Sequence, residues 1–545
     1  MRDSQTGPRR SRDAKPARLA RLGTAALLGA LAAAAALAAG QVVAIFTGAS
    51  SAPVYAVGAA AVNLTPAPLK DYAVAHFGVH DKQLLIAGIL AALTGIALLA
   101  GIAAMRGFAL GAALIALFGA VGVAAAETQP QSGPSWALPS VLGAAAGIGA
   151  LRLLTRAYHA ARTQLDRSAG IQPDHSTRTE HDHSTRIRHD PGRRRFVATA
   201  AGLAAGSAVV GVGADLIATR RSSVAAARAA VRIPRPAYPA APLPYGVHPN
   251  VAGLSPFFTD NEVFYRVDTA LVLPQVRPDS WTLRVHGMVD RPIELSFADL
   301  LHLPLHEHDV TVSCVSDPVG GPYVGNARWI GASLPDLLRA AGVRRGADQL
   351  LARSVEGMTI GTPLGSVLDG REALIAVAMN GEPLPVAHGF PARVVVPGFY
   401  GYASACKWVT DLYVTTFAAS TAYWVQRGYA RVGTMKTQSR IDVPKPFARV
   451  AAGPVTVAGI AWATGRAIQD VQVRVDQGPW QSARLAAQDG PDTWRQWTYD
   501  WHATPGSHGL QVRAADSSGR FQTEARADPL PDGASGWERV VVTVV

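Results

Sequence analysis

The amino-acid sequence predicts three structural parts: a bundle of five transmembrane α-helices, an α+β domain and a β-sandwich. Three observations lead to this prediction. Long runs with almost no charge fill the first 220 residues or so. Short strand-like and amphipathic helical segments mix between about 250 and 440. Alternating apolar runs separated by Gly, Pro and Asp turns fill roughly the last 100 residues. With 545 residues, the chain is long enough for several domains.

The apolar runs of the N-terminal part are long enough to cross a membrane. A helix of ~20 residues spans the ~30 Å hydrocarbon core of a bilayer. A buried helical core of a soluble protein explains runs of this length poorly, and their many small residues allow close helix packing. We therefore expect membrane-spanning helices at 22–46, 83–105, 107–126, 136–155 and 196–218.

Basic residues between these runs predict the orientation of the chain. Residues 1–21 contain seven Lys or Arg, and residues 152–195 contain ten Arg, whereas 47–82 is almost neutral and 127–135 has no Lys or Arg. Basic loops remain in the cytoplasm. We therefore expect the N-terminus inside and everything after about residue 220 outside. Because much of the net charge of +12 flanks membrane helices, no nucleic-acid partner is expected.

The segment before the fifth run carries two further features. DHSTR occurs at 174–178 and again at 182–186; this His-rich tract could bind metal, but a solvated, disordered linker is the favoured interpretation. GRRRF at 192–196 resembles the entry of a twin-arginine export signal, with a plain basic flank as the alternative. The five runs contain no histidine, so no bis-histidine haem is expected within the bundle.

The predicted domain boundaries follow from these changes in composition. They are a basic N-terminus (1–21), a four-helix region (22–155), a His/Arg-rich linker (156–195), a fifth helix (196–218), a Pro/Ala-rich connector or spacer (219–250), the α+β domain (251–440) and the sandwich (445–545).

Cys314 is one of two cysteines in the chain, and it ends the alternating run DVTVSC. We expect it where a strand gives way to a Gly-rich loop. A thiolate there could bind a metal, act as a nucleophile or pack, and its spacing alone favours a buried structural cysteine. Zinc-finger spacing and an HExxH helix are both absent. From these residues, a Cys–His hydrolase also remains an alternative function.

A second polar cluster lies at 380–408. It contains Asn380, His388, Arg393 and Lys407 around glycine-rich backbone. Arg forks and backbone N–H groups both suit phosphate, so the cluster indicates an anionic, heteroatom-rich ligand. A dinucleotide-binding GxGxxG signature is absent, and surface charge on a strand–loop–strand is the alternative.

Several motifs taken together resemble the sulfite oxidase family of molybdenum enzymes. They are FYRVDT (264–269), SCVSDPVGGPYVGNARWIG (313–331), AMNGEPLPVAHGFPARVVVPG (378–398) and CKWV (406–409). WRQWTYDW near the C-terminus resembles that family's immunoglobulin-like dimerisation domain. The resemblance covers about 250–545. It implies a Mo-pterin oxidoreductase domain, a molybdenum–molybdopterin cofactor, an immunoglobulin-like sandwich and a homodimer as one candidate assembly.

The resemblance also implies roles for individual residues. Cys314 matches the single protein thiolate that ligates molybdenum, which makes it both the metal ligand and a catalytic residue. Arg266 and Trp329 complete the implied catalytic set, with Trp329 on the substrate side; no role follows for its neighbour Arg328. The implied cofactor-binding residues are Tyr265, Arg266, Ser354, His388, Arg393 and Lys407.

The sequence departs from the family where sulfite would bind. Cys314 is followed by Val-Ser-Asp-Pro-Val instead of the arginine-bearing stretch of sulfite oxidases, and Asp317 adds a negative charge. Val377 replaces a tyrosine. Charge-assisted hydrogen bonds are worth ~1.5–3 kcal/mol each, so their loss weakens an oxyanion site. We therefore expect oxygen-atom transfer on a small S- or N-oxide substrate rather than sulfite oxidation, with an unassigned electron partner.

No haem domain of the animal type is expected. Two rival functions stay open: a non-catalytic binding or scaffold protein that retains the fold, and the Cys–His hydrolase. Cys406 is expected to pack, and no disulfide between Cys314 and Cys406 is expected, because it would consume the metal ligand.

Overall fold

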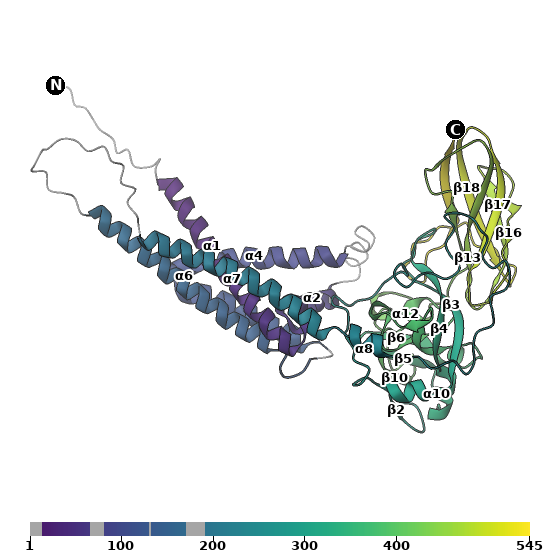
Figure 1. Ribbon diagram of the computed structural model, residues 1–545, viewed down its shortest axis with the longest axis horizontal. Coiled ribbons are helices and arrows are strands. Elements are labelled where there is room, and N and C mark those ends of the chain that lie inside the picture. The colour runs from purple at the N-terminus through teal and green to yellow at the C-terminus, as the bar shows by residue number, and fades with distance from the viewer. Residues whose placement is uncertain (1–13, 66–80, 130–131, 171–190) are drawn as a thin grey trace, which may run out of the picture. The chain divides into compact units, whose positions relative to one another are not determined.

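The computed structural model describes residues 14–65, 81–129, 132–170 and 191–545 (Figure 1). The chain divides into two compact units. The first extends to Ser223 and includes Ala270–Val272, and the second contains Val224–Thr269 and Leu273–Val545. The duplicated DHSTR segment and residues 1–13 lie outside the described residues.

The first unit is helical. Five of its described helices are long and apolar enough to cross a membrane, and they coincide with the five predicted runs. Helix α1 packs against α4, α6 and α7 (Figure 1). The long helices are α1 (Ala14–Thr47), α4 (Asp81–Arg106), α5 (Phe108–Glu127), α6 (Leu138–Gly170) and α7 (Pro191–Ser222).

Small residues set the spacing of these helices. A Cβ atom on Gly29 of α1 would collide with the carbonyl oxygen of Ala97 in α4. Reciprocally, a Cβ atom on Gly101 would collide with the carbonyl oxygen of Ala25. The backbones of α1 and α4 can therefore approach closely only because both positions are glycine.

Two features of the helical unit differ from the prediction. A short helix α2 (Pro53–Leu64), preceded by a 3-10 turn η1 (Ala49–Ser51), occupies part of the expected loop 47–82. Helix α6 continues beyond the predicted end at 155, because good helix formers such as Ala, Arg, Leu and Gln continue after it. The candidate span of α6 therefore contains His159, and the expectation that these spans lack histidine is wrong.

The second unit begins with a mixed α/β core built on two sheets. One has the order β3-β4-β7-β8, with β9 on β7; the other has the order β2-β1-β10-β5-β6. Its strands are β1 (Thr282–Gly287), β2 (Ile293–Ser296), β3 (Leu305–Ser313), β4 (Val324–Ser333), β5 (Gln349–Ser354), β6 (Thr359–Pro363), β7 (Leu374–Met379), β8 (Glu382–Pro383), β9 (Arg393–Val395) and β10 (Val409–Thr415).

Short helices connect these strands. Helix α10 shows why they start and stop: the Ser333 side chain accepts the N–H of Asp336, and Gly342 ends the helix with φ 73°. The helical segments are α8 (Ala225–Ala230), α9 (Phe297–His302), α10 (Leu334–Ala341), α11 (Leu364–Val367), η3 (Val386–His388), α12 (Gly401–Ser404) and η4 (Val425–Arg427).

The C-terminal part of this unit is a two-sheet sandwich, with strand orders β11-β13-β17-β16 and β12-β19-β18-β14-β15. Residues of both sheets share one apolar core around Trp497, Val471 and Val542. The alternating apolar runs expected in roughly the last 100 residues form strands of this sandwich. The strands are β11 (Gln438–Val443), β12 (Arg449–Val450), β13 (Gly453–Trp462), β14 (Ile468–Val475), β15 (Gln481–Ser482), β16 (Arg484–Leu485), β17 (Arg495–Ala503), β18 (Gly506–Asp516) and β19 (Glu538–Val544).

The connector pairs with the mixed core instead of running free as a spacer. The N–H of Tyr238 donates to the carbonyl of Leu305 at 3.1 Å, and the N–H of Glu307 donates to the carbonyl of Tyr238 at 2.8 Å. These bonds cover the outer edge of β3, which is the end strand of its sheet. The carbonyl of Leu305 and the N–H of Glu307 on that edge are thereby hydrogen-bonded.

Candidate active site

Cys314 lies where strand β3 gives way to a loop, as predicted. Its N–H donates to the carbonyl of Tyr323 at 2.9 Å, and its Sγ lies 2.9 Å from Ser316 Oγ. The side chain is densely surrounded but remains partly accessible. Burial raises the pKa of the Cys314 thiol, against a lowering effect of the Ser316 hydrogen bonds. Ionisation here would therefore require a cation, such as a metal ion.

A buried carboxyl group closes the loop that follows Cys314. Asp317 Oδ1 accepts the N–H of Tyr323 at 2.8 Å. Burial raises the pKa of Asp317 to about 7, although this hydrogen bond and Arg440 oppose the shift. A Cβ atom on Gly321 would collide with the Asp317 carboxylate. The glycine-rich sequence therefore allows the loop to fold over its own carboxyl group.

Phe264 brings three predicted site residues together. Its ring stacks on Tyr265 with a centroid distance of 5.3 Å, and its edge contacts are Trp329 at 6.1 Å and His388 at 5.5 Å. Burial and the nearby Cys314 raise the pKa of Tyr265. The phenol is therefore protonated at neutral pH and can act as a hydrogen-bond donor.

His388 and Arg393 form the next part of the site. His388 Nε2 lies 3.1 Å from the carbonyl oxygen of Asn261, which makes this nitrogen the donor. Burial and neighbouring cations lower the pKa of His388 to about 4, so the ring is neutral. Arg393 Nη1 donates to the carbonyl of His388 at 3.2 Å. Gly389, with φ 110°, allows the backbone turn that brings the His388 carbonyl to the Arg393 side chain.

Lys407 adds a second buried cation to this region, after Arg393. Its Nζ lies 2.7 Å from Asp268 Oδ2, and Arg266 Nε lies 2.8 Å from the same oxygen. Burial lowers the pKa of Lys407 to about 8, while Asp268 opposes this shift. Asp268 was not predicted from the sequence, although it lies in the FYRVDT motif two positions after Arg266. Two cations, Lys407 and Arg266, thus pair with one buried carboxylate.

Two buried polar atoms in this region have no hydrogen-bond partner among the described residues: Arg393 Nε and Ser354 Oγ. Ser354 ends β5 and pairs in register with Val409, two positions after Lys407. A buried polar group without a partner costs ~1–3 kcal/mol, so such atoms indicate ligand contacts. Excess positive charge, glycine-rich backbone and unpaired donors fit a phosphate-bearing pterin.

Other predicted residues are engaged in packing or in turns. Trp329 is fully buried; its Nε1 donates to the carbonyl of Val310 at 3.2 Å, and the Arg393 guanidinium lies 4.9 Å from its ring. Arg328 makes a bidentate ion pair with Asp309 at 2.8 and 2.7 Å. The Asn380 side chain accepts the N–H of Arg328 at 3.0 Å and donates to the carbonyl of Thr259 at 2.9 Å.

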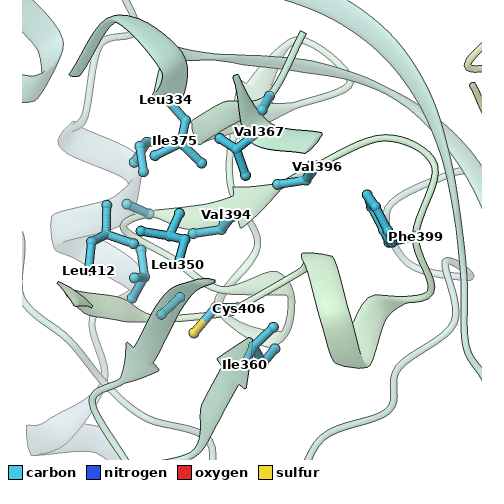
Figure 2. Close-up of a cluster of buried hydrophobic side chains, with 14 of the residues drawn as sticks. Leu334, Leu350, Ile360, Val367, Ile375, Val394, Val396, Phe399, Cys406 and Leu412 are labelled. Carbon is cyan, nitrogen blue, oxygen red and sulfur yellow. The ribbon is translucent and has the colours of Figure 1, made fainter. Parts of the chain in front are cut away.

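Cys406 packs in the apolar core. It is fully buried among side chains such as Leu350, Ile360 and Val394, as Figure 2 shows. Both cysteines are free thiols. This confirms the expectations that Cys406 packs and that the two cysteines form no disulfide.

Within the described residues, no group of three or more His, Cys, Asp and Glu side chains could hold a metal ion. A metal bound by Cys314 would therefore need further ligands from outside the chain. A pterin dithiolene offers soft sulfur ligands of this kind.

Comparison with known proteins agrees with a molybdopterin-binding site. The family described as "Oxidoreductase molybdopterin binding domain" matches residues 270–424. The chain is 33% identical to sulfite oxidase of Gallus gallus over 321 residues, which cover 50% of this chain and 69% of that one. It is 36% identical to the uncharacterized oxidoreductase YuiH of Bacillus subtilis (strain 168) over 149 residues, 27% of this chain and 72% of that one.

Two further matches differ in how much of the other protein they cover. The chain spans 59% of the mitochondrial sulfite oxidase of Drosophila melanogaster, at 31% identity and over 52% of its own length. Among solved structures, the sulfane dehydrogenase SoxCD from Paracoccus pantotrophus has 24% identity and a TM-score of 0.47. That match covers 53% of this chain and 82% of the other.

Proposed function

Because this chain belongs to the sulfite oxidase family of molybdopterin-dependent oxidoreductases, we propose that it transfers oxygen atoms to or from a small S- or N-oxide-type substrate. The observation that carries the proposal is that Cys314 and Arg393 both affect the pKa of Tyr265, while Lys407 affects that of Cys314, so the thiol and the two cations lie in one region. Molybdopterin supplies two-electron oxygen-atom chemistry when it is bound. In the reductive direction, the balance is XO + 2e⁻ + 2H⁺ → X + H₂O.

The proposed roles follow from the contacts of each side chain. Cys314 would hold the metal. Arg393 Nε and Ser354 Oγ would donate to the cofactor, and Lys407, oriented by Asp268, would neutralise its phosphate. Neutral His388 would bind the cofactor through a hydrogen bond and not through charge. Arg266 forms an ion pair with the same carboxylate, that of Asp268, and so lies beside the site.

The loop after Cys314 supports a substrate other than sulfite. Its charged side chain is Asp317, whose pKa of about 7 leaves it partly ionised near neutral pH. A carboxylate repels an anion such as sulfite, whereas a neutral sulfoxide or amine N-oxide carries a strong acceptor oxygen without net charge. This feature favours the neutral class of substrate.

The hydrolase alternative finds less support. A Cys–His hydrolase needs an imidazole within about 3 Å of the thiol, so that the thiolate forms. Cys314 Sγ forms its hydrogen bond with Ser316 Oγ, and burial raises the pKa of the Cys314 thiol. His388 donates to a backbone carbonyl instead.

We also propose that the chain is a multi-pass membrane protein with its catalytic part outside the cytoplasm. The five candidate spans and their basic flanks support this topology. The sandwich is proposed to be immunoglobulin-like and to offer a dimerisation surface.

The GRRRF segment at 192–196 is proposed to act as a twin-arginine export signal. Replacing Arg193 and Arg194 with Lys should then leave the C-terminal unit inside the cell. Unchanged protease access from outside would argue against twin-arginine export.

The central experiment is molybdenum and pterin analysis of the purified full-length chain, followed by a redox-dye assay. We expect about one molybdenum per chain and turnover with a dialkyl sulfoxide or amine N-oxide, but little with sulfite. Cys314→Ser should abolish turnover, while the control Cys406→Ala should retain molybdenum. Absence of stoichiometric molybdenum would favour the scaffold alternative, and alkylation of Cys314 without metal loss would favour the hydrolase.

A further inference from the structure

Helix α8 packs against the apolar core that supports the candidate active site (Figure 1). It begins at Ala225, and only two residues separate it from the end of α7, the fifth candidate span. Val224, which precedes the helix, is only 1% exposed and shares an apolar cluster with Phe264, Trp329 and Leu384. This short segment is therefore part of the packing that supports the aromatic side chains of the site.

Arg228 of α8 donates to the backbone of another short segment. Its Nε donates to the carbonyl of Leu384 at 2.8 Å, and its Nη2 donates to the carbonyl of Pro383 at 2.6 Å. The same Nη2 lies 2.9 Å from Glu382 Oε2. Pro383 and Pro385 have no backbone N–H, so this stretch has few donors of its own with which to pair. The guanidinium therefore holds three consecutive residues in place.

The segment that Arg228 holds leads directly to His388. We call residues 382–388 the His388 arm. Asn261 contacts both ends of this arm: its Nδ2 donates to Glu382 Oε1 at 2.6 Å, and its carbonyl accepts the N–H of His388 Nε2 at 3.1 Å. The Asn261 hydrogen bond, followed by the contact with Arg228, lowers the pKa of Glu382 against a raising effect of burial. The carboxylate therefore stays ionised at neutral pH and links the two side chains.

We propose that Arg228 is a positioning residue of the cofactor site, which fixes the start of the His388 arm and thereby determines where the His388 ring lies. Arg228 acts through Glu382 and Asn261 and does not touch the cofactor. The inference rests on the cofactor role proposed for His388. Arg228 lies before residue 270, where the match to the molybdopterin-binding family begins. The segment that follows the fifth candidate span would thus take part in holding the cofactor.

The test compares Arg228→Met with Arg232→Met in the purified full-length chain. Arg232 is an exposed arginine that donates to carbonyls of its own segment. We expect Arg228→Met to release pterin roughly 10-fold faster, as the loss of charge-assisted hydrogen bonds predicts. Hydrogen exchange of the backbone amides at 386–390 should also be faster, because the amide of His388 donates to Pro385 within the arm. Arg232→Met should match the wild type in both measurements.

A double-mutant cycle separates positioning from general destabilisation. In a His388→Ala background, Arg228→Met should have little further effect on pterin release, because both changes act through the same ring. Additive effects of the two changes would overturn the proposal. If Arg228→Met does not fold, Glu382→Gln removes the charge between Arg228 and Asn261 and should show the same faster release and exchange; wild-type behaviour of folded Glu382→Gln would then refute the proposal.

Two further outcomes are decisive. Pterin release at the wild-type rate from folded Arg228→Met would overturn the proposal. If the wild type holds no pterin, exchange alone decides, and unchanged exchange at 386–390 in Arg228→Met would overturn it. Tight pterin binding in the wild type without turnover of a sulfoxide or an N-oxide would instead count against the proposed function alone.

Discussion

Arg440 Nη1 donates a hydrogen bond of 2.7 Å to the carbonyl of Gly321. This bond joins the first strand of the sandwich to the loop that follows Cys314. The same guanidinium pairs with Asp442 at 2.9 Å and donates to Ser255 at 3.0 Å. The sandwich therefore helps to hold the loop that closes over the proposed substrate side.

Replacement of Arg440 by Ala should loosen this loop. The guanidinium is mostly buried, and its removal deprives Asp442 of its ion-pair partner and the Gly321 carbonyl of this donor. We expect a loss of about 1–3 kcal/mol in the free energy of unfolding and a lower kcat. Arg484, whose ion pair with Asp500 is exposed, is the control. Equal effects of Arg484→Ala and Arg440→Ala would contradict a specific role for the Gly321 contact.

Lys407→Met should impair cofactor retention. It removes the buried cation that is paired with Asp268 and next to His388. We expect molybdopterin content after purification to fall several-fold, measured by fluorescence of the released pterin. The control Lys436→Met removes a more exposed lysine that pairs with Asp532. Full cofactor content in Lys407→Met would exclude Lys407 from the binding site.

Trp329→Phe tests what this indole does. Because Trp329 is fully buried behind Arg393, we expect reduced cofactor retention and a nearly unchanged KM in the molecules that keep the cofactor. Substrate titration of the metal-loaded fraction measures both. A large rise in KM with normal cofactor content would instead support the position on the substrate side that the sequence resemblance implied.

Glu538 should make stability depend on pH. Burial raises the pKa of this carboxyl group to about 7, above the unfolded value of about 4.3. The folded state therefore binds the proton more tightly. This contribution to stability is fully present below about pH 4 and is lost as pH rises through 7.

Glu538→Gln should remove this dependence. The free energy of unfolding of the variant relative to the wild type should increase between pH 5 and 8, measured by urea unfolding. The exposed Glu524, replaced by Gln, is the control. A difference between Glu538→Gln and wild type that stays constant over this range would refute the assignment.

The strand before Cys314 was predictable because DVTVSC alternates with the period of a strand and meets a glycine-rich loop. Helix α2 was missed because its 12 residues are too few to span a membrane. Asp268 was missed because its burial depends on Lys407, 139 positions away. Likewise, no local pattern shows that Trp329 lies behind Arg393.

The pairing of Tyr238 with β3 has a practical consequence for truncation. A soluble fragment that began at residue 251 would uncover the carbonyl of Leu305 and the amide of Glu307, and would present a bare strand to other molecules. A fragment that began at Val224 would retain Tyr238 and with it both hydrogen bonds to β3. The segment that joins the catalytic unit to the helices thus also covers a strand edge that would otherwise promote aggregation.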